Sequence, residues 1–137
     1  MKNYLIIGGS SGVGNELVKI LESKGNSIVA TYNKNEVSNR ENVLYFKLDV
    51  SEGNLSLENL PDEIHGLAYC PGAINLKPFT RFKEEDFIED FKLQVLGATR
   101  IIQQVLPRLK ASTNASIVLF STVAVQSGFN YHSQVAM

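Results

Sequence analysis

Seven residues near the amino terminus, GGSSGVG, have the composition of a phosphate-binding loop. Gly8, Gly12 and Gly14 give the spacing GxxxGxG, a variant of the fingerprint of dinucleotide-binding folds. Glycine lets a strand turn directly into a helix and lets the backbone approach a pyrophosphate closely. Free N–H groups at the helix start and the hydroxyls of Ser10 and Ser11 would then face the phosphates. A glycine-rich turn without a ligand is the alternative interpretation.

A second group of reactive side chains lies near the carboxyl end, in FSTVAVQSGFNYHSQVAM, Phe120 to Met137. Ser121 and Thr122 carry hydroxyls and come directly after an apolar run. Tyr131 and His132 follow in a polar loop. Hydroxyl, phenol and imidazole groups can donate or accept protons. The elements around these residues decide whether they meet the glycine turn.

Apolar runs predict five buried β-strands. The first, YLIIG, enters the glycine turn directly, as expected of a parallel strand buried on both faces. The others are rich in β-branched and aromatic residues. The predicted strands span Tyr4 to Gly8, Ser27 to Tyr32, Asn42 to Val50, the run GLAYC that ends at Cys70, and Ala115 to Ser121.

Two helices are predicted between these strands. Apolar residues recur at helical spacing from Val13 to Lys24, and most clearly from Glu84 to Leu109, where Pro107 predicts a nearby end. The polar stretch NKNEVSNRE predicts a loop or at most one helical turn. This order of elements, without hairpin signals, predicts an α/β fold with a parallel sheet covered by helices. No repeat or linker interrupts residues 1–137, which are expected to form one domain.

Composition excludes several classes of function. The chain has 137 residues, 44% hydrophobic and 20% charged, which is ordinary for a globular domain. Thirteen basic and fourteen acidic side chains give a net charge of -1, so neither nucleic acid nor a membrane is an expected partner. One cysteine and two histidines predict no disulfide and no metal cluster. Cys70 is interpreted as a buried structural residue and His65 as a structural residue on the surface. Tyr4 to Ile7 is too short for a signal peptide, so a cytoplasmic location is expected.

The motifs, taken in order, resemble those of the short-chain dehydrogenase/reductase family. Its members begin with this glycine turn and a Rossmann-type doubly wound parallel sheet. Asp49 in KLDV resembles the acidic residue that meets the adenine, and YCPG, Tyr69 to Gly72, resembles the NNAG segment. Gly97 in QVLG resembles the glycine of NxxG, and Ser121 with Thr122 lies where the family has two serines. The resemblance covers the whole chain.

The resemblance implies a nicotinamide cofactor. NAD is usually held by an acidic residue after the second strand, but that place holds Tyr32, followed by Asn33 and Lys34. NADP is therefore slightly favoured over NAD, with Lys34 beside the phosphate; Lys34 as a solvated loop residue is the alternative. The implied cofactor residues are Gly8, Ser10, Ser11, Gly12, Val13, Gly14, Tyr32, Asn33, Lys34, Asp49, Val50, Cys70, Pro71 and Gly72.

The resemblance also implies the catalytic residues, with one departure. The family's serine, which holds the substrate oxygen, corresponds in position to Thr122, next to Ser121. The family's asparagine, which supports a water, corresponds in position to Gln94. The proton donor is a tyrosine whose pKa is lowered by a lysine four residues later. Counting thirteen residues from Thr122 reaches Val135, and the lysine position lies beyond Met137. Tyr131, or a different donor such as His132, would have to replace the tyrosine.

These observations leave several functions open. One is an oxidoreductase that transfers hydride between a nicotinamide and a small carbonyl or alcohol substrate. Another is a non-catalytic dinucleotide-binding protein, and a third is an inactive fragment, because the family's tyrosine position is Val135. Family members are about twice as long, so the sheet is expected to be truncated after its fifth strand. An open apolar edge then predicts a homo-oligomer, dimer or tetramer, formed there or through the helix from Glu84 to Leu109.

Overall fold

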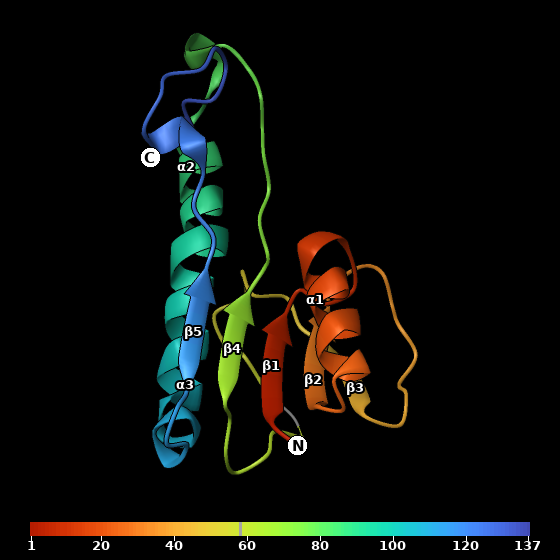
Figure 1. Ribbon diagram of the computed structural model, residues 1–137. Coiled ribbons are helices and arrows are strands. Elements are labelled where there is room, and N and C mark those ends of the chain that lie inside the picture. Colours follow the sequence, from red (N-terminus) through yellow and green to blue (C-terminus); the bar gives the residue numbers. More distant parts are fainter. Residues whose placement is uncertain (58) are drawn as a thin grey trace.

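A computed structural model, which describes residues 1–57 and 59–137, contains one five-stranded sheet. Its strand order is β3-β2-β1-β4-β5, and every neighbouring pair is parallel. The predicted α/β fold with a parallel sheet is confirmed (Figure 1). The strands are β1 (Asn3–Ile7), β2 (Ser27–Tyr32), β3 (Val43–Lys47), β4 (Gly66–Tyr69) and β5 (Ser116–Leu119).

The third strand is shorter than predicted because the chain turns at Asp49. The Asp49 carboxylate accepts hydrogen bonds from the backbone N–H of Ser51 at 2.9 Å and from its hydroxyl at 2.6 Å. Such a side-chain turn competes with the ladder of a strand. Strand β3 therefore ends at Lys47, and Val50 lies in the turn rather than in the sheet.

The two predicted helical regions are present, and the second is divided into three segments. Helix α1 (Gly12–Ser23) follows the glycine turn. The long region consists of α2 (Glu84–Phe91), the π-helical segment η2 (Lys92–Leu96) and α3 (Gly97–Ala111). Helix α3 continues past Pro107 to Ala111, so the expected end is displaced but close. Short 3₁₀ turns lie at η1 (Phe79–Arg81) and η3 (Val123–Val125).

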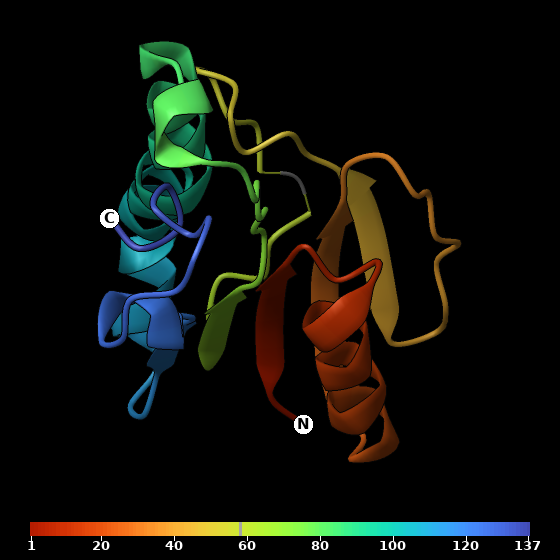
Figure 2. The same cartoon turned by 90° about the horizontal axis from the view of Figure 1, so that it is seen from above.

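Helices lie on both faces of the sheet, with α1 on one and α3 on the other (Figure 2). On the first face Val18 of α1 packs with Ile6 and Ile28. On the second, Ile101 and Val105 of α3 pack in one cluster with residues of β1 and β4. This arrangement buries the three central strands and leaves their carboxyl ends free for a site. None of the helices in the described ranges is long and apolar enough to cross a membrane.

The prediction that the fifth strand is buried is wrong. Ile117 and Leu119 of β5 are 42% and 56% exposed. Strand β5 lies at the edge of the sheet, pairs only with β4 among the described residues, and contributes no residue to either hydrophobic cluster. Among the described residues, the outer edge of β5 is therefore unpaired and its apolar side chains are exposed.

Two residues interpreted as structural lie at the two ends of β4. His65 is half-buried rather than on the open surface, because its Nδ1 accepts a hydrogen bond from the backbone N–H of Asn3 at 3.1 Å. Its Nε2 lies 3.4 Å from Glu63. Cys70 is half-buried, and burial raises the pKa of its thiol. The His65 side chain therefore ties the start of β4 to β1, whereas Cys70 packs against the hydrophobic cluster beside α1.

Candidate functional site

The glycine turn has a backbone conformation that other residue types adopt only with strain. Gly8 and Gly12 have φ values of +77° and +54°, in the left-handed region that favours glycine. Gly14 has a different reason to be glycine, because a Cβ there would collide with the carbonyl oxygen of Gly8. Ser11 precedes α1, yet its side chain makes no capping hydrogen bond in the described structure. The first N–H groups of α1 are thus left for a ligand.

Thr31, which sequence reasoning missed, anchors this turn to β2. Its hydroxyl accepts a 2.9 Å hydrogen bond from the N–H of Gly8, and its carbonyl accepts one of 2.8 Å from Gly9. Thr31 is 1% exposed, so these bonds are shielded from water. The position of a threonine within a β-rich run gave no local signal for this role.

The glycine turn borders a cavity of about 520 Å³, here called the turn cavity. It opens at the carboxyl ends of β1, β2 and β4, where the strand order reverses. Two of the expected cofactor residues are outside its lining: Gly14 lies beneath the turn, and Asp49 is held by Ser51. The expected residues that line it are Gly8, Ser10, Ser11, Gly12, Val13, Tyr32, Asn33, Lys34, Val50, Cys70, Pro71 and Gly72, joined by Thr31, Asn35, Leu48 and Leu93.

Polar residues after β2 form one wall of the turn cavity. Tyr32, Asn33 and Lys34 line it, and Lys34 is the only charged side chain among its described lining residues. The nearby carboxylate of Asp49 has a lowered pKa, chiefly because Ser51 donates hydrogen bonds to it, with Asn33 and the charge of Lys34 adding to the effect. Asp49 is therefore ionised at neutral pH.

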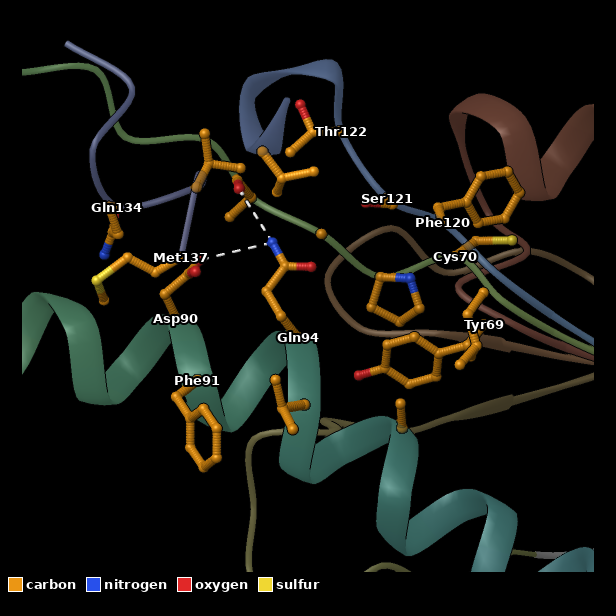
Figure 3. Close-up of a pocket in the computed structure, with 18 of the residues that line it drawn as sticks. Tyr69, Cys70, Asp90, Phe91, Gln94, Phe120, Ser121, Thr122, Gln134 and Met137 are labelled. Carbon is orange, nitrogen blue, oxygen red and sulfur yellow. Dashed lines mark hydrogen bonds between the residues drawn. The ribbon is translucent and has the colours of Figure 1, made fainter. Parts of the chain in front are cut away.

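A second cavity of about 430 Å³, here called the strand-end cavity, lies at the carboxyl ends of β4 and β5 (Figure 3). Three expected catalytic residues, Gln94, Ser121 and Thr122, line it together. Cys70, Pro71 and Gly72 line both cavities, so the YCPG segment is their common border. The fold thus brings the residues after β5 beside those that border the glycine turn.

The π-helical segment η2 carries Gln94 into the strand-end cavity. The Gln94 side-chain nitrogen donates to the carbonyl of Ala73 at 3.4 Å and to the carboxylate of Asp90 at 3.5 Å (Figure 3). Both neighbours are acceptors, so the amide nitrogen faces them and the oxygen of Gln94 is left to accept.

A tyrosine from β4 holds the same segment. The buried Tyr69 hydroxyl donates a 2.5 Å hydrogen bond to the carbonyl of Leu93, and burial raises the pKa of Tyr69 strongly. Gly97 lies against this hydroxyl and has no room for a Cβ. Long-range packing therefore sets the shape of the helix beside Gln94.

The two hydroxyl residues after β5 have different surroundings. Thr122 is the N-cap residue of η3, and its hydroxyl accepts a 3.2 Å hydrogen bond from the N–H of Ala124. Ser121 makes no side-chain hydrogen bond within the described chain and is exposed. Of the two, Ser121 therefore has the hydroxyl that is free to hold a substrate oxygen.

The residues considered for proton donation lie in different places. Val135 lines the strand-end cavity. Tyr131 lines neither cavity and is 56% exposed, with a φ of +68°. His132 lies outside both linings, and its Nδ1 is 2.7 Å from the carbonyl of Asn130. The described structure thus brings neither alternative donor to Gln94 and Ser121.

The fold and its two cavities define a doubly wound α/β protein with a crevice at the carboxyl ends of its strands, the place where ligands bind in this class. The sequence model of the short chain dehydrogenase family matches residues 2–134, and the chain belongs to this family. A comparison with curated protein sequences gives no match.

Solved structures share the fold at low sequence identity. A short-chain dehydrogenase from Streptomyces avermitilis is 22% identical, with a TM-score of 0.84 over 99% of this chain and 55% of its own. A short chain dehydrogenase family protein from Francisella tularensis is 18% identical, with a TM-score of 0.82, and 57% of it is covered. Serine dehydrogenase from Escherichia coli is also 18% identical, with a TM-score of 0.86, and 67% of it is covered. The chain thus spans between about half and two thirds of these structures.

Proposed function

We propose that this chain forms the dinucleotide-binding part of an NAD(P)-dependent oxidoreductase that acts on a small carbonyl or alcohol substrate. The single observation that carries the proposal is the common border of the two cavities at Cys70, Pro71 and Gly72. A dinucleotide in the turn cavity would reach this border, beyond which Gln94 and Ser121 lie. When bound, the nicotinamide supplies or accepts a hydride.

The residues of the turn cavity fit a dinucleotide. The glycines allow close approach of a pyrophosphate, and the uncapped start of α1 offers N–H groups and a positive dipole end to it. Ser10 and Ser11 add hydroxyl donors. Apolar side chains of Val13, Leu48 and Leu93 complete the lining.

Lys34 favours NADP over NAD within this proposal. Its ammonium would pair with the extra phosphate of NADP, and no carboxylate stands among the described lining residues of the turn cavity. Lys34→Gln is expected to weaken NADPH binding about tenfold and to leave NADH binding within about twofold. Lys24→Gln, an exposed lysine at the far end of α1, is the matched control.

In the strand-end cavity, Ser121 would donate a hydrogen bond to the substrate oxygen, and the Gln94 carbonyl oxygen would accept one from substrate or water. Val135 cannot transfer a proton. This observation favours a second candidate, a dinucleotide-binding protein without catalysis. Tyr131 and His132 remain the proposed donors for a catalytic protein, and either would have to enter the cavity from its present position.

Fluorescence titration with NADPH and NADH tests the proposal, followed by turnover assays with a panel of carbonyl compounds. Saturable binding and turnover that Ser121→Ala lowers at least tenfold would support the oxidoreductase. Turnover abolished by Tyr131→Phe would identify that residue as the donor. Binding without turnover would favour the second candidate, and no binding of either nucleotide would refute both.

The proposal includes assembly and location. The open edge of β5 and the exposed Ile88 and Leu106 of the long helix offer apolar surfaces to a second copy. Light scattering combined with size-exclusion chromatography is expected to give a dimer or tetramer, and a clean monomer would contradict this part. A cytoplasmic location suits a chain with one cysteine.

A further inference from the structure

Asp90 is the only charged side chain among the described residues that line the strand-end cavity. It lies near the end of α2, one helical turn before Gln94. The cavity walls around it are largely apolar and include Phe87, Phe91 and Val95. A lone carboxylate beside such walls loses solvation that something else must replace.

Two acids of the same helix, Asp86 and Glu89, have lysine partners, whereas Glu84 and Glu85, unpaired in the described part of the chain, are exposed to water. Asp86 lies 2.7 Å from the ammonium of Lys77, and Glu89 lies 3.3 Å from that of Lys92. Asp90 has no ion pair within the described ranges, and its hydrogen bond from Gln94 is long at 3.5 Å. Burial raises the pKa of the Asp90 carboxyl, as expected where no cation offsets the lost solvation.

The helical wall of the cavity therefore presents acceptors. The nitrogen of Gln94 is occupied by Ala73 and Asp90, which leaves the Gln94 oxygen to accept, and the Asp90 carboxylate accepts as well. In Figure 3, Asp90 lies on one side of Gln94, whereas Ser121 and Cys70 lie on the other, toward the turn cavity. A ligand that fills this space meets a hydroxyl donor near the turn cavity and a carboxylate at the far side.

We infer that the strand-end cavity selects a hydroxy or oxo substrate that carries a protonated amine. The amine pairs with Asp90 and the substrate oxygen lies at Ser121, so the reacting carbon is the one nearer the turn cavity. The inference rests on the proposed oxidoreductase function and names its substrate class. Asp90 acts here by positioning and selecting the substrate.

Matched ligands test the charge preference without any turnover. The probes are the ω-amino alcohols from ethanolamine to hexanolamine, each paired with the alcohol in which a methyl group replaces the ammonium. Dissociation constants come from ¹H–¹⁵N NMR titrations of the labelled chain at neutral pH, and the side-chain amide signal of Gln94 reports binding at this site. At least one amino alcohol is expected to bind about tenfold more tightly than its neutral partner.

Two variants distinguish the effect of the Asp90 carboxylate from that of the overall negative charge of α2. Asp90→Asn keeps the shape and is expected to reduce the preference to about twofold or less, whereas Glu89→Gln, on the exposed side, keeps it. Equal binding of every charged and neutral pair, or a preference that survives in Asp90→Asn, overturns the inference. NADPH titration of the same samples tests the proposed oxidoreductase function separately from the inferred substrate class. Nucleotide binding without amine preference refutes only the substrate class, and amine preference without nucleotide binding refutes the oxidoreductase.

Discussion

The contact between Gly97 and Tyr69 gives a prediction that can be worked from the structure. A methyl group at Gly97 would collide with the Tyr69 hydroxyl and would lie 3.0 Å from the carbonyl oxygen of Val50. Tyr69 is 5% exposed and its hydroxyl is bonded to Leu93, so any shift of the ring away from an added methyl group would break that hydrogen bond. Gly97→Ala is therefore expected to destabilise the fold although alanine is the better helix former.

The magnitude follows from opposing contributions. Alanine improves helix propensity by about 1 kcal/mol. Overpacking costs about 1–3 kcal/mol, and loss of the Tyr69 hydrogen bond leaves the buried carbonyl of Leu93 without that partner, at a further cost of about 1–3 kcal/mol. Together these contributions give an expected net loss for Gly97→Ala of about 1–5 kcal/mol in the free energy of unfolding, or about 3 kcal/mol at their mid-range values. Tyr69→Phe alone is expected to lose about 1–2 kcal/mol.

A double-mutant cycle measured by urea unfolding tests this explanation. Because Tyr69→Phe removes the atom nearest to the added methyl, the double variant is expected to be about 1–2 kcal/mol more stable than the sum of the two losses predicts. Gly53→Ala, where a Cβ meets nothing within 4 Å, is the control and should stay within about 0.5 kcal/mol of the parent. Additive losses, or a Gly97→Ala variant as stable as the parent, would refute the reasoning.

Further predictions concern the glycine turn and the turn at Asp49. Gly14→Ala is expected to lose at least about 2 kcal/mol of unfolding free energy, because its methyl meets the backbone of Gly8, and an unchanged urea midpoint would contradict this. Thr31→Val is expected to cost about 1–3 kcal/mol and to weaken NADPH binding, since it removes a buried acceptor; unaltered nucleotide affinity would show that the anchor is not needed for binding. The lowered pKa of Asp49 means that its contribution to stability is full above the usual carboxyl range and is lost as the pH falls through that range and below it. Ser51→Ala should therefore reduce the stability difference between neutral and acidic pH, and identical pH profiles would argue against it.

The parts of the fold that the sequence predicted depend on local patterns. Strand β1 and the turn at Gly8 follow from an apolar run that meets glycines, and α1 follows from its helical spacing. The other strands and their parallel direction follow from the same kind of apolar runs and from the absence of hairpin signals between them. Most residues of the turn cavity lie at or just after the carboxyl ends of strands, so their proximity was also predictable, whereas Leu93 comes from η2.

Other features depend on contacts between distant segments and carry no local signal. The π-helical segment η2 lies within a regular apolar pattern, and only the position of Tyr69 against Leu93 and Gly97 explains where it falls. Thr31 and Asp90 are common residue types in ordinary patterns. The role of Thr31 depends on the contact between β2 and Gly8. The role of Asp90 depends on the position of α2 beside the carboxyl ends of β4 and β5.

The separation of the two cavities makes their chemistry independently testable. They share only a short segment, Cys70 to Gly72, among their described lining residues, and each has one charged side chain, Lys34 in the first and Asp90 in the second. The two charges are opposite in sign, so an anionic group is favoured in the turn cavity and a cationic group in the strand-end cavity. A change at Lys34 should therefore alter nucleotide affinity without altering amine preference, and a change at Asp90 should do the reverse. If a change at Lys34 or at Asp90 strongly altered both nucleotide affinity and amine preference, the two cavities would be coupled through their shared segment. They would then have to be described as one coupled site and not as two separate sites.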